Sequence, residues 1–301
     1  MSLLKNTHMR IAHISDLHFA KVTFSPTQFL SKRFLGNLYL LFKRGREFKA
    51  HRLTNFAKYL KEQHVDFVII TGDFSQTARD IEFEMAFDFL DELKAENLPT
   101  FCIPGNHDAY TKKAYLSKRF YDFFDHDFDQ KFPFTLKMDG FEIHPLGKHY
   151  FWVGIDCAKH TPLHASYGIF DEKLETKLKK GLSLIPKEKH IIFCNHFPFR
   201  QSSAKRSHSL LRAHALESLL KQYPNIQLYL HGHEHKHAIL DLREENLPIC
   251  IDSGSASHQM KGSFNLLDLS KNHMTVHSLK ANHFLPPNIH WEKFSETQFE
   301  L

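Results

Sequence analysis

The sequence predicts an α/β protein built on a mainly parallel sheet. Short apolar runs that end in polar residues alternate with helical segments, and 42% of the 301 residues are hydrophobic, enough for a large core. Repeated strand-helix-strand units imply parallel neighbours, whose carboxyl ends meet at one edge of the sheet. We therefore expect functional side chains directly after these runs.

The amino-terminal half contains three predicted strands with helices between them. Each strand ends in a polar group: 9–15 at Asp16-Leu17-His18, 65–71 at Gly72-Asp73, and 98–103 at Pro104-Gly105-Asn106-His107-Asp108. Apolar residues at helical spacing predict helices over 50–63 and 77–96. The three polar groups should therefore lie at a common sheet edge.

The carboxyl-terminal half is predicted to hold further strands over 150–156, 191–194 and 226–230, and a charged helix over 171–181. Two of these strands end at Asn195-His196 and at His231-Gly232-His233-Glu234-His235. The runs 249–252, 264–269 and 274–279 predict strands of a second sheet. The aromatic-rich segment 112–134 is predicted to be helical, without a chemical role.

Composition indicates one domain spanning residues 1–301, with a helical insert over 19–52 and a tail over 281–301, because no linker-like or low-complexity segment divides the chain. The four separated cysteines fit reduced packing residues of a cytoplasmic protein, and no apolar run is long enough to span a membrane. A net charge of +5 is too small to indicate a nucleic-acid partner.

Five strand ends deliver side chains that bind metals. Each alone could be a helix cap or a surface histidine, but together they supply carboxylate, amide and imidazole donors: Asp16, His18, Asp73, Asn106, His196, His233 and His235. This thiolate-free set predicts two divalent cations, Mn²⁺ first, with Fe, Zn or Mg as alternatives. Two ions about 3.5–4 Å apart suit phosphoester hydrolysis by a bridging hydroxide. We expect Asp73 to bridge them, His107 to donate a proton, and Asp108 to orient His107.

These blocks resemble the calcineurin-like metallophosphoesterases in order and spacing, from about residue 9 to 256. The resemblance implies a four-layer α-β-β-α sandwich. It implies one ion among Asp16, His18, Asp73 and His235, and another among Asp73, Asn106, His196 and His233. It also places His107, backed by Asp108, at the catalytic histidine position.

The insert is basic and apolar, with eight Lys or Arg and one acid between Lys21 and Arg52. Such a segment fits a helix at a membrane interface, a lid over an apolar substrate, or a helical hairpin packed on the core. The candidate substrate or membrane contacts are Lys32, Arg33, Phe34, Leu38, Leu41, Phe42 and Arg44, with Arg200 and Arg206 from a later basic loop.

The insert resembles that of a bacterial branch including the chlamydial-type UDP-2,3-diacylglucosamine pyrophosphatase of lipid A synthesis. This resemblance implies a cytoplasmic enzyme, peripheral to the inner membrane, that cleaves a lipid-linked nucleotide diphosphate into UMP and an acylated sugar phosphate. The alternative is a soluble phosphodiesterase for cyclic nucleotides or small diesters. A non-catalytic scaffold would lack ligands, and none is missing here. The sequence does not predict the oligomeric state.

Overall fold

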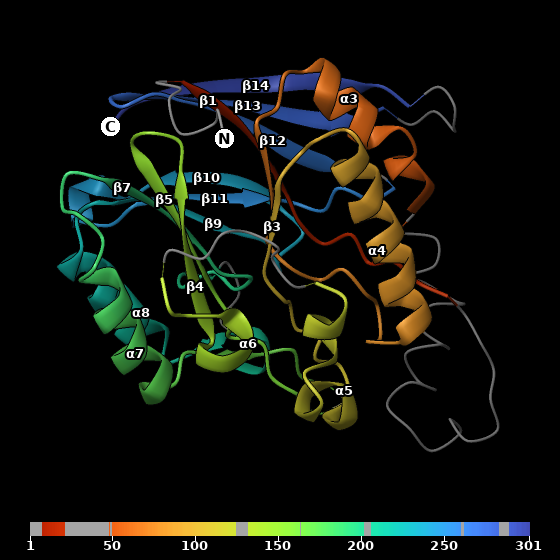
Figure 1. Cartoon of the computed structure of the whole chain (residues 1–301), viewed down its shortest axis with the longest axis horizontal. Coiled ribbons are helices and arrows are strands. Elements are labelled where there is room, and N and C mark those ends of the chain that lie inside the picture. The colour runs from red at the N-terminus through yellow and green to blue at the C-terminus, as the bar shows by residue number, and fades with distance from the viewer. Residues whose placement is uncertain are drawn as a thin grey trace.

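The computed structural model describes residues 8–21, 48, 50–124, 132–162, 164–201, 206–259, 262–282 and 289–301, except for the side chains of residues 50, 51 and 206. The described chain contains two six-stranded sheets and a short two-stranded one. Figure 1 shows the two large sheets with helices beside them.

The first sheet has the order β14-β13-β12-β1-β2-β3. Its strands are β1 (Met9–Ile14), β2 (Phe67–Ile70), β3 (Thr100–Cys102), β12 (Ser263–Leu269), β13 (His273–Ala281) and β14 (Trp291–Glu300). Strands β1, β2 and β3 are parallel, as predicted, while β12 pairs antiparallel with β1. The prediction that 264–269 and 274–279 belong to a second sheet is therefore wrong, because these strands extend the first sheet beyond β1.

The second sheet has the order β10-β11-β9-β7-β5-β4. Its strands are β4 (Phe141–Leu146), β5 (Tyr150–Ile155), β7 (His190–Cys194), β9 (Ile226–His231), β10 (His237–Asp241) and β11 (Ile249–Ser253). The four central strands are parallel, and β4 and β10 close the two edges antiparallel. The small sheet pairs β6 (Gly168–Ile169) with β8 (Leu210–Leu211).

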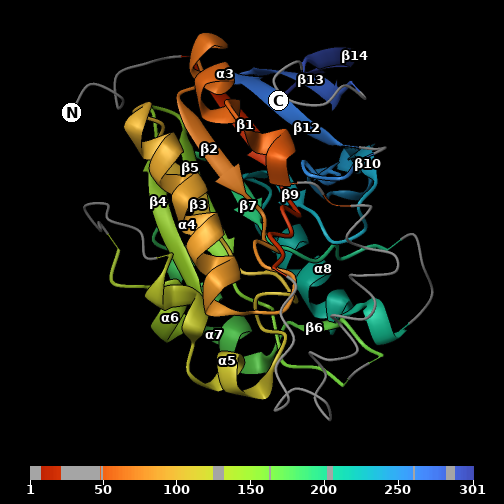
Figure 2. The same ribbon diagram turned by 90° about the vertical axis from the view of Figure 1, so that its right-hand side faces the viewer.

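Helices cover the outer side of each large sheet. Beside the first sheet lie α3 (Phe56–Glu62) and α4 (Asp80–Ala95); beside the second lie α7 (Glu172–Leu182) and α8 (Ala213–Gln222). Figure 2 shows α4 running along β2 and β3. The layers are therefore helix, sheet, sheet and helix, as the resemblance implied.

The predicted helix over 50–63 is interrupted. A 3-10 turn (Ala50–Leu53) precedes α3, and Asn55 between them has a left-handed φ of 61°. The aromatic segment contains α5 (Lys112–Leu116) and a 3-10 turn (Arg119–Asp122), followed by α6 (Leu136–Asp139); residues 125–131 lie outside the described part.

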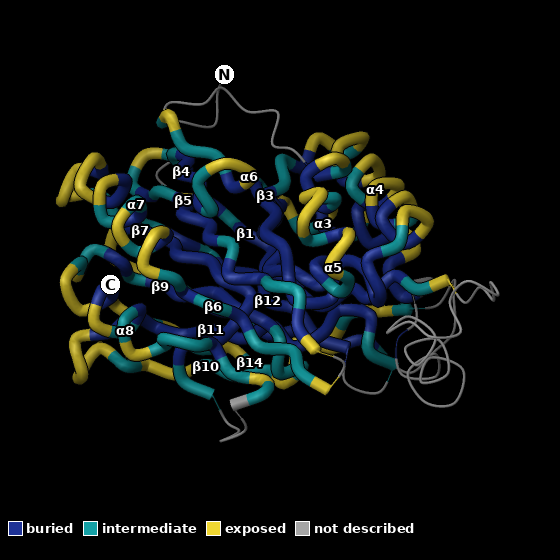
Figure 3. Tube along the Cα trace, turned by 90° about the horizontal axis from the view of Figure 1, so that it is seen from below, coloured by how far each residue is buried: buried dark blue, intermediate teal, exposed yellow. Residues whose placement is uncertain are grey.

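Successive side chains of a strand point to opposite faces of its sheet, and this alternation divides the hydrophobic core into two parts. On β7, Ile192 and Cys194 pack between the two sheets, whereas Ile191 and Phe193 pack toward α7 and α8. Figure 3 shows the central strands buried and the helices exposed at the periphery. All four cysteines are buried and free. Among the described residues, no helix is sufficiently long and apolar to cross a membrane.

Candidate metal centre

The structure brings all seven predicted metal ligands together at strand ends of both sheets. Asp16 and His18 follow β1, Asp73 follows β2, and Asn106 follows β3. The second sheet supplies His196 after β7, and His233 and His235 after β9. The parallel strands deliver these side chains to one region although they are separated by more than 200 residues of sequence.

Five of these residues have backbone conformations that side chains rarely adopt. The φ angles are 55° at Asp16, 47° at His18, 56° at Asp73, 74° at His233 and 52° at His235. Left-handed non-glycine residues carry conformational strain that the surrounding structure must hold, and they concentrate at functional sites. Hydrogen bonds connect the loops that follow β1 and β2. The backbone N–H of Asp16 donates to the carbonyl oxygen of Gly72 at 3.0 Å, and that of His18 donates to the carbonyl oxygen of Asp73 at 2.9 Å.

Glycines in three of the motifs allow the ligands to approach. A Cβ at Gly105 would overlap the carboxylate of Asp73, and one at Gly232 would overlap the carboxylate of Asp16. Gly72 has a φ of 95°, and a Cβ there would lie 2.7 Å from Nδ1 of His196. The Gly-Asp, Gly-Asn-His and Gly-His-x-His patterns therefore have a steric cause: only glycine leaves room for the neighbouring ligand.

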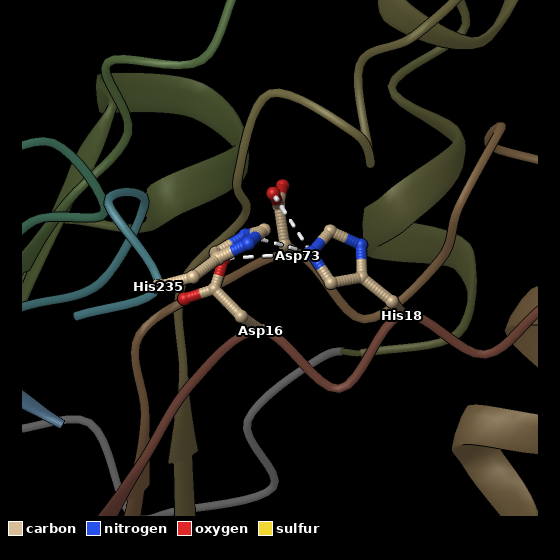
Figure 4. A group of neighbouring side chains, drawn as sticks. All are labelled: Asp16, His18, Asp73 and His235. Atoms are coloured by element: carbon tan, nitrogen blue, oxygen red, sulfur yellow. Dashed lines mark hydrogen bonds and ion pairs between the residues drawn. The ribbon is translucent and has the colours of Figure 1, made fainter. Parts of the chain in front are cut away.

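Asp16, His18, Asp73 and His235 form the first ligand set. One donor atom from each lies within 4.8 Å of all the others. Nε2 of His235 lies 3.0 Å from Oδ1 of Asp16 and 3.1 Å from Nε2 of His18, and Figure 4 shows the four side chains pointing toward one another. Two nitrogens and two carboxylates converging in this way match a first-row divalent cation.

Asp73, Asn106, His196 and His233 form the second set. Nε2 of His196 lies 3.4 Å from Oδ2 of Asp73 and 3.2 Å from Oδ1 of Asn106. Nδ1 of His233 lies 2.8 Å from the same oxygen of Asn106. Oδ2 of Asp73 is also 3.8 Å from Nε2 of His18, so this one oxygen lies between the two sets.

A buried oxygen supports the assignment of a cation to the first set. Oδ1 of Asp16 is buried and makes no hydrogen bond of good geometry in the described structure, although Nε2 of His235 lies 3.0 Å from it and Nε2 of His18 lies 3.6 Å from it. A cation placed between this oxygen and the two imidazole nitrogens would satisfy all three groups. The donor chemistry and this oxygen both fit a divalent metal ion.

The surrounding imidazoles keep the carboxylates of Asp16 and Asp73 ionised, which is the form that binds metals. Burial would raise the pKa of Asp73, but the imidazoles of His196 and His107 hold its pKa well below the usual range. In turn, burial lowers the pKa of His196 while Asp73 raises it, to about 9 overall. The pKa of His233 falls to about 3 because of burial and the adjacent His196. Cation binding would therefore displace a proton from His196.

His107 lies beside the first set, with its ring centroid 4.9 Å from that of His18. Its Nδ1 is 2.6 Å from the carbonyl oxygen of Gln76, so Gln76 orients the ring. The expectation that Asp108 does so is wrong. The Asp108 carboxylate instead accepts hydrogen bonds from the backbone N–H groups of Phe74, Ser75 and Gly105, and so ties the loop after β2 to the loop after β3.

Sequence reasoning missed three residues that shape this centre. The carbonyl of Thr71 lies 2.7 Å from Nδ1 of His196, which directs Nε2 of that ring toward Asp73. Gln76 orients His107, as described above. Phe48 packs its ring 4.4 Å from that of His18 and 5.3 Å from that of His235. Backbone carbonyls carry no sequence signal, but Phe48 belongs to the aromatic-rich insert.

Most of the predicted insert contacts cannot be placed. Lys32, Arg33, Phe34, Leu38, Leu41, Phe42 and Arg44 lie outside the described residues, as does the side chain of Arg206. Arg200 is described, and its guanidinium pairs with Glu245 at 2.6 Å and Glu217 at 2.8 Å. The structure therefore ties Arg200 to two glutamates and does not show it at the metal centre.

Comparisons with known proteins agree with this geometry. The chain is 27% identical over 188 residues to a 3′,5′-cyclic adenosine monophosphate phosphodiesterase of Haemophilus influenzae, covering 60% of this chain and 61% of that protein. It is 26% identical over 236 residues to a probable glycerophosphodiester phosphodiesterase of Arcobacter nitrofigilis, covering 77% and 75%. A dimetal phosphatase from Danio rerio has a similar fold, with a TM-score of 0.62, 15% identity, and 95% and 99% coverage.

Residues 9–237 match the calcineurin-like phosphoesterase family, a range that includes every predicted metal ligand. The chain therefore belongs to the calcineurin-like metallophosphoesterases.

Proposed function

We propose that this chain is a dinuclear-metal phosphodiesterase acting on small diesters, cyclic nucleotides or glycerophosphodiesters among them. The position of Oδ2 of Asp73 carries the proposal, because this oxygen lies 3.8 Å from Nε2 of His18 and 3.4 Å from Nε2 of His196. A carboxylate between two ligand sets is what a pair of adjacent cations requires.

Two divalent cations bound there would activate water and neutralise charge on the phosphoryl oxygens. Asp16, His18 and His235 would hold one ion, Asn106, His196 and His233 the other, and Asp73 both. His107 would protonate the leaving oxygen. Because Nδ1 of His107 is held by the Gln76 carbonyl, Nε2 is the nitrogen assigned to proton transfer.

The relatives support a small diester more than a lipid-linked diphosphate. The relatives from Haemophilus influenzae and Arcobacter nitrofigilis are both named as phosphodiesterases, the first for cyclic adenosine monophosphate and the second, as probable, for glycerophosphodiesters. The lipid-linked nucleotide diphosphate, the membrane association and the choice of Mn²⁺ stay predictions. The insert that motivates the first two lies largely outside the described residues.

A substrate panel tests the proposal. The Mn²⁺-loaded protein is assayed with cyclic adenosine monophosphate, glycerophosphocholine, bis(p-nitrophenyl) phosphate and a UDP-diacylglucosamine. We expect hydrolysis of at least one small diester with a higher kcat/KM than that of the lipid substrate. A higher kcat/KM for the lipid would restore the lipid interpretation, and hydrolysis of none would refute both.

A further inference from the structure

A cavity of about 510 Å³ is lined by residues of α5, α6 and α7 and of the loops next to them. Figures 1 and 2 show these three helices at the same end of the molecule. The volume is in the range of sites that bind small organic ligands. Its lining includes none of the seven predicted metal ligands, nor His107. The cavity is therefore a different site from the metal centre.

One wall of the cavity is the loop that carries Asn106 and His107. Pro104, Asp108 and Ala109 of this loop line the cavity. The carboxylate of Asp108 is also the group that joins this loop to the loop after β2. A ligand in the cavity would therefore contact the scaffold of the metal centre without contacting a metal ligand.

Two apolar side chains that line the cavity are exposed to solvent. Met138 of α6 is 71% exposed and Leu116 of α5 is 66% exposed, the two highest values among the large hydrophobic side chains of the described chain. Phe120 and Leu136 add buried apolar surface to the same lining. Exposed apolar surface beside a cavity is typical of a ligand-binding site, because a ligand with an apolar body would remove it from water.

The lining also carries an excess of positive charge, with five lysines and one arginine against four aspartates. Each aspartate already accepts a hydrogen bond from the protein: Asp108, Asp139, Asp156 and Asp171. Lys118 and Lys173, in contrast, form no ion pair with any residue that the structure describes, and Lys118 donates to the carbonyl oxygen of Lys137. The cavity therefore offers two ammonium groups to an anion.

We propose that this cavity binds a small amphipathic anion, a molecule with an apolar body and one carboxylate or phosphate group. The body would cover Leu116 and Met138, and the anionic group would lie near Lys118 and Lys173. A purely polar anion would leave the two apolar side chains in water, and a neutral apolar molecule would leave the two ammonium groups without a partner. The observations together favour a ligand that has both parts.

Binding of 1-anilinonaphthalene-8-sulfonate tests the proposal, because this dye combines an aromatic body with one anionic group and fluoresces in apolar sites. We expect saturable binding of one dye per chain, both with and without Mn²⁺, since no metal ligand lines the cavity. Binding only to the Mn²⁺-loaded protein would place the dye at the metal centre and overturn the proposal, as would the absence of saturable binding. The assay needs no turnover, so its outcome is separate from that of the proposed phosphodiesterase.

Exposed apolar residues provide a matched pair of double variants. Leu116→Ser with Met138→Ser removes the apolar side chains of the cavity, and we expect the Kd of the dye to rise about tenfold. The control is Leu184→Ser with Leu240→Ser, at positions that are 54% and 48% exposed and do not line the cavity. This control should keep the Kd of the wild type. Equal effects of the two double variants would overturn the proposal.

Charge reversal tests the anionic part. Lys118→Glu with Lys173→Glu should raise the Kd of the dye about threefold or more. The control Lys58→Glu with Lys61→Glu, on α3, changes the net charge of the chain equally and should leave the Kd unchanged. Equal effects of both charge reversals would overturn the proposal.

Displacement of the dye identifies the anionic group. Octanoate, octyl phosphate and octyl glucoside are added to the dye-bound wild type below their micelle concentrations. We expect both anions to displace the dye, and the one that acts at the lower concentration shows whether the cavity prefers carboxylate or phosphate. Equal displacement by the neutral octyl glucoside, or no displacement by any of the three, would overturn the proposal.

Discussion

The backbone N–H of His107 donates a hydrogen bond to Oδ1 of Asp73 at 2.8 Å. This bond occupies one oxygen of the carboxylate and leaves Oδ2 as the one that lies between His18 and His196. The loop that carries the proposed proton donor therefore also orients the proposed bridging ligand. Together with the hydrogen bonds of the Asp108 carboxylate to Phe74 and Ser75, this contact joins the loops that follow β2 and β3.

Asp73→Asn should remove the shared ligand and with it most activity. An amide carries no charge and offers one oxygen, so we expect the bound metal to fall below one ion per chain and turnover to drop on the order of 10³-fold or more. Metal analysis after dialysis checks the first result. Asp241→Asn, which breaks only a surface pair with Arg243, is the control and should keep its metal. Full metal content in Asp73→Asn would refute the bridging role.

His107→Ala should separate metal binding from proton transfer. No predicted ligand is lost, and the backbone N–H that bonds Asp73 stays in place. We expect metal content to be unchanged and kcat to fall by roughly 10²–10⁴, the usual contribution of a general acid. Substrates with a better leaving group should lose less. A variant with the turnover of the wild type would exclude His107 as the proton donor.

Gly232→Ala should damage the first ligand set specifically. The added Cβ would overlap Oγ of Ser15 and the carboxylate of Asp16, so Asp16 must move. We expect weaker binding of one of the two ions. The control Gly181→Ala also creates an overlap, with the ring of Phe141 under α7, and should cost roughly 1–3 kcal/mol of stability without changing metal content. Equal metal loss in both variants would contradict this assignment.

Arg200→Ala should leave catalysis intact although the sequence pointed to substrate contact. Its guanidinium pairs with Glu217 and Glu245, and its side chain is 34% exposed. We expect KM to stay within about twofold and stability to fall by less than ~1 kcal/mol, as for a surface ion pair. A tenfold increase in KM would return Arg200 to the substrate site.

His13 should make the metal-free protein sensitive to acid. Burial lowers the pKa of His13 from 6.5 to about 3 in the folded state. Between these values the unfolded chain binds a proton that the folded chain does not, so stability falls as the pH drops below about 6.5. At about pH 5 this amounts to ~2 kcal/mol. Urea unfolding at about pH 7 and 5 measures the free energy of unfolding. Its decrease between these pH values should be smaller for His13→Gln than for wild type, and an equal decrease would refute the role of His13.

The sequence was sufficient to place the ligands at strand ends, because an apolar run followed by Asp, Asn or His marks the carboxyl end of a buried strand. The parallel order of β1, β2 and β3 followed from the helices between them. The sequence was not sufficient to place β12 and β13 in the first sheet. The pairing of Met9 with Leu269 joins residues far apart in the chain, and such a pairing leaves no local signal in the sequence.

Polar contacts inside the site were harder to predict than the ligands themselves. Asp108 follows His107 directly, which suggested contact with the imidazole, yet its carboxylate accepts backbone N–H groups from two loops. The group that does hold the ring is the carbonyl of Gln76, which any residue type would provide.

Anomalous diffraction from crystals grown with Mn²⁺ tests the central claim most directly. We predict two peaks, about 3.5–4 Å apart, with the Asp73 carboxylate between them, one beside His18 and His235 and the other beside Asn106 and His196. A single peak, or two peaks of which neither contacts Asp73, would contradict the account.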